Sequence, residues 1–150
     1  MNWQCLPFSQ LTTHQLYDLL KLRVDVFIVE QDCPFSDLDN RDQLTSVYHL
    51  CGYEQDKLVA YARLMPPGSV FEKASIGRVV TSPDARGSGA GQALMREAIR
   101  QCELFWPGVD IEIAAQEYLL NFYQSFGFEA FTDAYLEDGI PHVDMRLHQS

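Results

Sequence analysis

The chain has 150 residues, of which 47% are hydrophobic and 21% charged, and its formal net charge is −10. This composition predicts one globular domain over residues 1–150 with a full hydrophobic core, and it argues against disorder. The acidic balance argues against a nucleic-acid partner. The sequence also lacks a secretory signal and an apolar run of about 18 residues that would cross a membrane, so we expect a cytoplasmic protein with no membrane partner.

The first half of the sequence predicts a strand, a helix, a loop and a hairpin. The helix is indicated by leucines at helical spacing after a threonine that can cap its first turn. The loop is marked by a proline and a cluster of aspartates. The expected segments are a strand over 3–7, a helix from Thr12 or Thr13 to about Val26, a loop over 33–44, and paired strands over 47–53 and 57–65.

The second half alternates apolar strands with helical stretches. We expect strands over 75–81, 111–115, 128–136 and 143–147, a long helix over 89–105 and a short helix over 119–126. Strands mixed with helices in this order predict the α/β (α+β) class, with a mixed sheet between helices.

A glycine-rich turn stands where a predicted strand passes into the long helix. Its sequence is Arg86-Gly87-Ser88-Gly89-Ala90-Gly91. Glycines leave the backbone bare, and the first amides of a helix carry partial positive charge, so this turn predicts a phosphate site with Arg86 at its rim. The spacing differs from that of a P-loop or a dinucleotide fingerprint. The alternative is a glycine-rich turn with no ligand.

The stretch from Ser75 to Met95 contains R-x-x-G-x-G and resembles the acyl-CoA motif of the GNAT superfamily of N-acetyltransferases. The stretch from Ala115 to Phe128, with Tyr-x-x-x-Gly-Phe, resembles the second GNAT signature. Residues 23–39 and 137–142 resemble the ElaA-like branch of that superfamily. The resemblance covers nearly the whole chain, although Gln116 stands where many members carry an asparagine.

The resemblance implies a GNAT fold, with about six or seven strands in a mixed central sheet, about four flanking helices, and parallel strands 75–81 and 111–115 that splay apart. Acetyl-CoA is the implied co-substrate, and its arm would enter that gap. The residues expected to bind it are Val79, Val80, Thr81, Arg86, Gly87, Ser88, Gly89, Ala90, Gly91, Gln116, Asn121 and Tyr123.

The implied reaction is transfer of an acetyl group from acetyl-CoA to a primary amine by direct attack, without an acyl-enzyme. By the same resemblance, backbone amides from Val79 to Ser82 would hold the thioester, and Tyr123 would protonate the departing thiolate. Glu30, His49 and Glu112 are candidates for the base that deprotonates the amine, and a chain of water molecules is the alternative. The alternative function is a non-catalytic acyl-CoA-binding sensor on the same fold.

The acidic composition favours a cationic acceptor, either a small-molecule amine or a peptide amine. Asp37, Asp39 and Asp42 cluster in the first loop and could recruit it; alternatively, they serve as turn residues that satisfy local amides. The four cysteines and four histidines show no metal-ligand spacing, so no metal is expected. The resemblance is also compatible with a homodimer.

Overall fold

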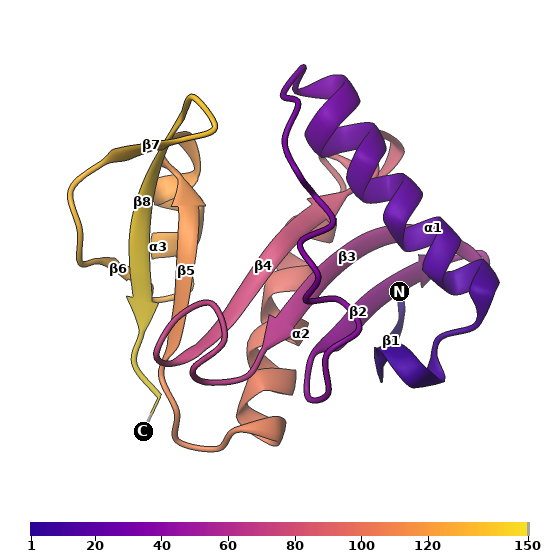
Figure 1. Ribbon diagram of the computed structural model, residues 1–150, viewed down its shortest axis with the longest axis horizontal. Helices are drawn as coiled ribbons and strands as arrows, with labels where there is room; N and C mark the ends of the chain where they lie inside the picture. The colour runs from indigo at the N-terminus through magenta and orange to yellow at the C-terminus, as the bar shows by residue number, and fades with distance from the viewer. Residues whose placement is uncertain (150) are drawn as a thin grey trace.

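A mixed sheet of eight strands runs through the structure, a computed structural model that describes residues 1–149 (Figure 1). The strands follow the order β1-β2-β3-β4-β5-β8-β6, and β7 pairs with the first part of β8. Their bounds are β1 Asn2–Pro7, β2 Tyr48–Glu54, β3 Lys57–Met65, β4 Ala74–Thr81, β5 Ile111–Gln116, β6 Glu129–Ala130, β7 Tyr135–Glu137 and β8 Ile140–Leu147.

Three α-helices accompany the sheet in the described residues, namely α1 Thr13–Arg23, α2 Ala90–Phe105 and α3 Leu120–Gln124. Thr12 caps α1 through a reciprocal pair of hydrogen bonds with Gln15, which satisfies amides that have no partner inside the helix. The mixed α/β class expected from the sequence is confirmed, with eight strands and three α-helices in the described residues in place of the six or seven strands and about four helices expected.

The first helical segment differs from its prediction. It does not end near Val26, because α1 passes at Arg23 into a π-helix over Val24–Glu30. The wider π turns carry the chain one turn further, so that Glu30 stands at the end of the helical segment. Residue composition does not distinguish π from α hydrogen bonding, and π segments occur most often at functional sites.

The predicted strand over 128–136 is also wrong. It is split into the short β6 and β7. The Phe131 amide still donates to the Asp144 carbonyl at 3.0 Å, and residues 132–134 lie outside both strands. The Thr132 hydroxyl accepts a hydrogen bond from the Asp144 amide, so a side chain replaces a backbone partner at this point. The split brings the sheet to eight strands. The predicted helix over 119–126 is likewise a 3-10 helix over Glu117–Leu119 followed by the short α3.

The two faces of the sheet are covered by different helices (Figure 1). Leu94, Met95 and Ala98 of α2 pack with alternate residues of the strands, including Ile113 and Ala115. On the opposite face Leu19 of α1 packs with the other set, which includes Cys51, Tyr61 and Val80. Successive strand residues point to opposite faces, so the two hydrophobic clusters report which side chains face which helix.

β4 and β5 are parallel neighbours that separate along their length (Figure 1). They pair only at Ala74 with Ile111 and at Ser75 with Glu112, whereas β5 pairs with β8 over its whole length. The expected splay between these strands is confirmed. Beyond Ser75 the neighbouring edges of β4 and β5 are released from pairing with each other, which opens the middle of the sheet.

A β-bulge interrupts β4 just after the splay begins. Arg63 of β3 pairs with Gly77 and Tyr61 pairs with Val80, so the single residue between them on β3 faces Arg78 and Val79 on β4. Arg78 has a φ of 51°, a left-handed conformation that is uncommon for a residue with a side chain. A bulge of this kind redirects backbone groups away from the ladder.

Arg23, at the end of α1, anchors the loop that follows the π-helix. Its side chain is fully buried and donates to the Asp37 carboxylate at 2.9 Å, to the Asp37 carbonyl at 3.0 Å and to the Asp42 carboxylate at 2.8 Å. Two arginines of the sheet complete the network. Arg63 donates to Asp42 at 3.0 Å, and Arg78 donates to Asp37 at 2.9 Å.

We predict that Arg23→Met destabilises the protein by about 3–5 kcal/mol, because it leaves two buried carboxylates without a principal partner. Urea unfolding at neutral pH measures the loss. Lys21→Met is the matched control, since Lys21 pairs with Asp25 on the exposed surface of the same helix and its removal should leave the midpoint nearly unchanged. Equal midpoints for Arg23→Met and wild type would contradict the prediction.

The same network makes this penalty dependent on pH. Burial raises the pKa of the Asp42 carboxyl, but the hydrogen bonds and charges of Arg23 and Arg63 outweigh burial and hold that pKa below its usual range. A lowered carboxyl pKa adds stability that is fully present above the unfolded value of about 4 and is lost as the pH falls through the folded value. The difference between wild type and Arg23→Met should therefore shrink below about pH 4.

Candidate active site

A cavity of about 960 Å³ opens where β4 and β5 separate. Its walls come from the two splayed strands, the π-helix, the loop after it, the 3-10 helix before α3, and the β7–β8 hairpin. Segments from the beginning, middle and end of the chain therefore meet at one place. The cavity joins the glycine-rich turn at one end to the acidic β7–β8 turn at the other.

Half of the residues expected to bind the co-substrate line this cavity, namely Val79, Val80, Thr81, Arg86, Gln116 and Tyr123. The glycine-rich residues Gly87, Ser88, Gly89, Ala90 and Gly91 continue from Arg86 at the mouth into the start of α2 and do not line it. Asn121 is exposed on α3 and also lies outside the lining. The role of Asn121 in binding the co-substrate stays a prediction.

The glycine-rich turn has the backbone that a phosphate cradle requires. Gly87 and Gly89 have φ values of 79° and 84°, in the left-handed region that glycine adopts without a steric penalty. Gly89 is the N-cap of α2, so the first amides of this sixteen-residue helix follow it directly. Those amides have no partner inside the helix and lie at the positive end of its dipole.

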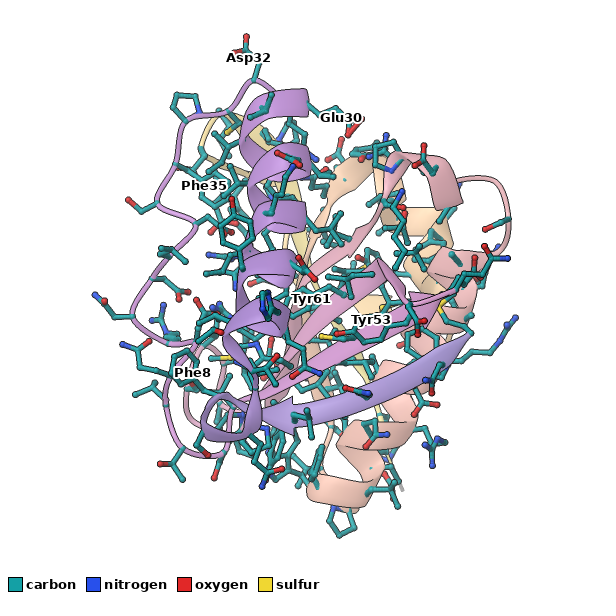
Figure 2. All side chains as sticks on the ribbon, turned by 90° about the vertical axis from the view of Figure 1, so that its right-hand side faces the viewer. Phe8, Glu30, Asp32, Phe35, Tyr53 and Tyr61 are labelled. Carbon is teal, nitrogen blue, oxygen red and sulfur yellow. The ribbon has the colours of Figure 1, made fainter. Side chains whose placement is uncertain are left out.

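Arg86 and Glu30 form a bidentate ion pair across the mouth of the cavity. Figure 2 shows Glu30 at the end of the helical segment, on the opposite side of the helix from Phe35 in that view. Hydrogen bonding to Arg86 lowers the pKa of Glu30. Both side chains are partly exposed, so an anion that reaches Arg86 must compete with Glu30 for the guanidinium.

The β4 bulge lies on the cavity wall beside the glycine-rich turn. Val79, its second residue, lines the cavity, and a bulge frees backbone groups from the strand ladder. Ser82 behaves differently from the prediction, because its amide donates to the Val59 carbonyl at 2.8 Å and is engaged within the fold. The bulge itself is held by Arg78, whose guanidinium bonds the Asp37 side chain and carbonyl and lies 5.5 Å from the centre of the Phe35 ring.

Tyr123 enters the cavity from α3. Its side chain is 7% exposed and packs edge-to-face against Phe122 and Phe128. Burial, with a smaller contribution from Tyr118, raises the pKa of Tyr123 to about 12. The phenol therefore keeps its proton throughout the neutral range and is available as a donor to a group bound in the cavity.

Two of the three proposed bases are occupied inside the protein. His49 was expected to face the cleft, but it is fully buried, with Nδ1 2.7 Å from the Tyr61 hydroxyl and Nε2 2.8 Å from the Asp42 carbonyl. Burial lowers the pKa of His49, which further disfavours its charged form. Glu112 is buried and accepts from Arg146 at 2.8 Å and from the Lys73 amide at 3.1 Å.

The expectation that Asp37, Asp39 and Asp42 recruit the acceptor is also wrong for two of the three. Asp37 and Asp42 are buried and are bonded to arginines of the same chain. Asp39 lines the cavity but is bonded through both oxygens to Arg63 at 2.8 Å. The three aspartates lie close together in the sequence, whereas the three arginines that neutralise them come from three different elements.

His142 lines the cavity near the start of β8, a place that its sequence context did not indicate. Its Nδ1 is 2.8 Å from the Ile140 carbonyl and its Nε2 is 3.6 Å from the Glu137 carboxylate. A single histidine in a strand carries no sequence signal of its exposure. Within residues 1–149, groups of three or more His, Cys, Asp or Glu side chains placed to share a metal ion are absent, as are helices able to span a membrane.

Comparison with known proteins identifies the class of protein to which this fold and its cavity belong. Residues 25–149 match the family model described as an acetyltransferase (GNAT) domain. The chain belongs to the GNAT acetyltransferase family, which uses acetyl-CoA, and it is an N-acyltransferase.

Its relatives place it in the ElaA-like branch. It is 46% identical over 145 residues to protein ElaA of Escherichia coli K12, covering 97% of this chain and 95% of that protein. The crystal structure of E. coli ElaA matches 99% of this chain and 100% of its own with a TM-score of 0.92 and 44% identity. An acyl-CoA N-acyltransferase from Pseudomonas aeruginosa matches 97% of this chain and 98% of its own, with a TM-score of 0.93 and 41% identity.

We predict that Gly89→Ala lowers the free energy of unfolding by about 1–2 kcal/mol, since a side chain at a φ of 84° is strained. Gly91→Ala is the matched control. Gly91 lies within the helix, and an added Cβ would meet the Phe122 ring at 3.7 Å, an ordinary contact, so this variant should be unchanged or up to about 1 kcal/mol more stable. Urea unfolding should show a loss of stability for Gly89→Ala and no loss for Gly91→Ala. Equal losses in the two variants would contradict the conclusion that the backbone at Gly89 requires glycine.

Proposed function

We propose that this protein transfers an acetyl group from acetyl-CoA to a primary amine by direct attack of the amine on the thioester. The observation that carries the proposal is a single cavity between splayed strands that holds a backbone bulge on one wall and a buried, protonated tyrosine on another. These are the groups that polarise a thioester carbonyl and protonate a departing thiolate.

The co-substrate would bind along β4 and the start of α2. The backbone amides from Arg86 to Gly91 would hold its pyrophosphate at the positive end of α2. The bulge at Val79 would present a backbone amide to the thioester oxygen, and the Gln116 side chain would contact the pantetheine arm from β5. Binding through backbone groups explains how a chain with a net charge of −10 could hold an anionic ligand.

In the proposed reaction the amine nitrogen forms a bond to the thioester carbon and the carbon–sulfur bond breaks. The sulfur leaves as a thiolate and takes its proton from the Tyr123 hydroxyl. The raised pKa of Tyr123 makes it a reservoir that stays filled at neutral pH. Enzyme groups act here by position and proton transfer, so a covalent acyl-enzyme is not required.

The acceptor is proposed to be a small-molecule or peptide amine that carries positive charge. Glu137 and Asp138 line the far end of the cavity, where an ammonium group would approach. The two carboxylates of this turn favour a cationic acceptor but do not select a particular amine. Homodimer formation and a cytoplasmic location stay predictions from the sequence.

Tyr123→Phe should lower amine-dependent release of CoA thiol by about 100-fold or more at neutral pH, because general acid catalysis contributes about that much. CoA affinity, measured by calorimetry, should stay unchanged. Tyr17→Phe, on the exposed side of α1, is the matched control and should behave as wild type. Equal rates for Tyr123→Phe and wild type would remove Tyr123 as the acid. Tight CoA binding by wild type without thiol release from any amine would instead indicate the sensor function.

Arg86→Gln should weaken CoA binding about tenfold, because it removes a charged donor from the pyrophosphate site. Glu30→Gln should tighten CoA binding a few-fold, since Arg86 would no longer be shared with a carboxylate. Calorimetry at low and high salt measures both affinities. Loss of turnover in Glu30→Gln with unchanged CoA affinity would oppose this account and favour Glu30 as a base.

A further inference from the structure

His142 occupies the wall of the cavity opposite the co-substrate strand. It lies on β8 and pairs with Gln116, the last residue of β5, which also lines the cavity. The side chain is about nine-tenths buried, so its exposed part faces the cavity rather than the outer surface. This position brings a titratable imidazole close to the gap between β4 and β5.

Hydrogen bonding determines which nitrogen of His142 is free. Nδ1 lies 2.8 Å from the Ile140 carbonyl, and a carbonyl can only accept, so Nδ1 carries the proton. Nε2 of the neutral ring therefore has a free lone pair. That nitrogen lies 3.6 Å from the Glu137 carboxylate, which is too long for a good hydrogen bond but close enough to stabilise a positive charge on the ring.

His142 and Tyr123 reach the cavity from opposite faces of the sheet. Ile113 and Ala115 of β5 pack in the cluster that contains α2 residues and Tyr123. Gln116 follows Ala115 and so points to the other face, and residues paired across an antiparallel ladder point the same way. His142 consequently faces the side of α1.

Four other candidate proton acceptors in this region are engaged elsewhere. Glu30 pairs with Arg86 at the mouth, and His49 and Glu112 are buried with their own partners. Burial raises the pKa of Asp39, but hydrogen bonds and charge from Arg63 outweigh it and hold that pKa well below its usual range, so Asp39 is a poor proton acceptor. His142 is left as the imidazole with a free lone pair on the cavity wall, beside the carboxylates of Glu137 and Asp138 on the β7–β8 turn.

We propose that Nε2 of His142 is the base that accepts the proton of the acceptor's ammonium group, with Glu137 stabilising the imidazolium that forms. This inference rests on the proposed acetyl transfer and supplies its missing proton acceptor. Here Glu137 is a positioning residue and His142 is the catalytic residue.

The proton balance of the reaction is closed. The ammonium gives one proton to Nε2, and the resulting amine attacks the thioester carbon. The carbon–sulfur bond then breaks, and the thiolate takes the proton of Tyr123. The second proton lost by the nitrogen as the amide forms restores the tyrosine, and the imidazolium releases its proton to solvent. One proton is released overall for each amide made from an ammonium ion.

The first test uses His142→Gln with benzylamine, spermidine and a lysine-containing peptide as acceptors. Thiol release at pH 7 should fall about 100-fold or more relative to wild type, while CoA affinity stays unchanged. Near pH 10.5, where about half of an alkylammonium is already deprotonated, the deficit should shrink below about tenfold. His148→Gln, on an exposed imidazole beyond the end of β8, is the matched control and should not change the rate.

The second test measures the wild-type protein by nitrogen-15 NMR without any acceptor. The His142 imidazole should show the proton on Nδ1 and a free Nε2. The titratable groups that face this ring are Glu137 and Tyr135 of β7, whereas β5 contributes the neutral Gln116. Glu137→Gln should lower kcat at pH 7 and leave the affinity for CoA unchanged, because the imidazolium would lose the carboxylate beside it.

A wild-type rate for His142→Gln at pH 7, or a deficit of the same size at pH 7 and 10.5, would overturn the assignment. So would a proton on Nε2 in the NMR spectrum, which also decides the matter if the variant fails to fold. If wild type releases no thiol with any of the three amines, the proposed acetyl transfer fails and His142 loses its role with it. If wild type releases thiol and only His142→Gln is slow, the acetyl transfer stands and the loss of rate reports on His142 alone.

Discussion

The buried network between three arginines and three aspartates is the interaction on which the site depends. Arg23, Arg63 and Arg78 come from α1, β3 and β4, and their carboxylate partners all lie in the loop after the π-helix. Burying so many charges is unfavourable unless each is paired and hydrogen-bonded. The set is balanced in charge, and it joins a loop, a helix end and two strands into one unit.

The network also determines the backbone at the centre of the cavity. Arg78 sits in the β4 bulge with a positive φ, and its guanidinium is held by the side chain and carbonyl of Asp37, 41 residues earlier in the chain. A strained conformation persists only where its surroundings hold it. The backbone amide proposed to polarise the thioester is thus positioned by a loop that itself belongs to the acceptor side.

The splay of β4 and β5 gives both faces of the sheet access to one space. In a continuous sheet, a side chain on the α2 face and one on the α1 face would be separated by the backbone layer. Here Tyr123 and His142 line the same cavity from opposite faces. The proposed proton donor and the proposed proton acceptor would therefore stand on different faces of the sheet at one cavity.

Local signals in the sequence predicted much of the fold. The apolar runs, the threonine cap and the glycine-rich turn depend on near neighbours, and the strands and helices appeared in the expected order. The predictions were wrong at the π-helix and at the split between β6 and β7, because both depend on hydrogen bonds that composition does not reveal. The glycine-rich turn was predicted well because positive φ values restrict the residue type directly.

By itself the sequence determined the family, the order of most elements, the glycine-rich turn before α2 and the tyrosine of α3, because each depends on residues close together in the chain. Only the tertiary structure decided which polar side chains are free. His49 and His142 are both strand histidines, yet one is enclosed by Tyr61 and a carbonyl and the other borders the cavity. Burial and charge pairing depend on contacts between distant segments, and those contacts exist only once the chain has folded.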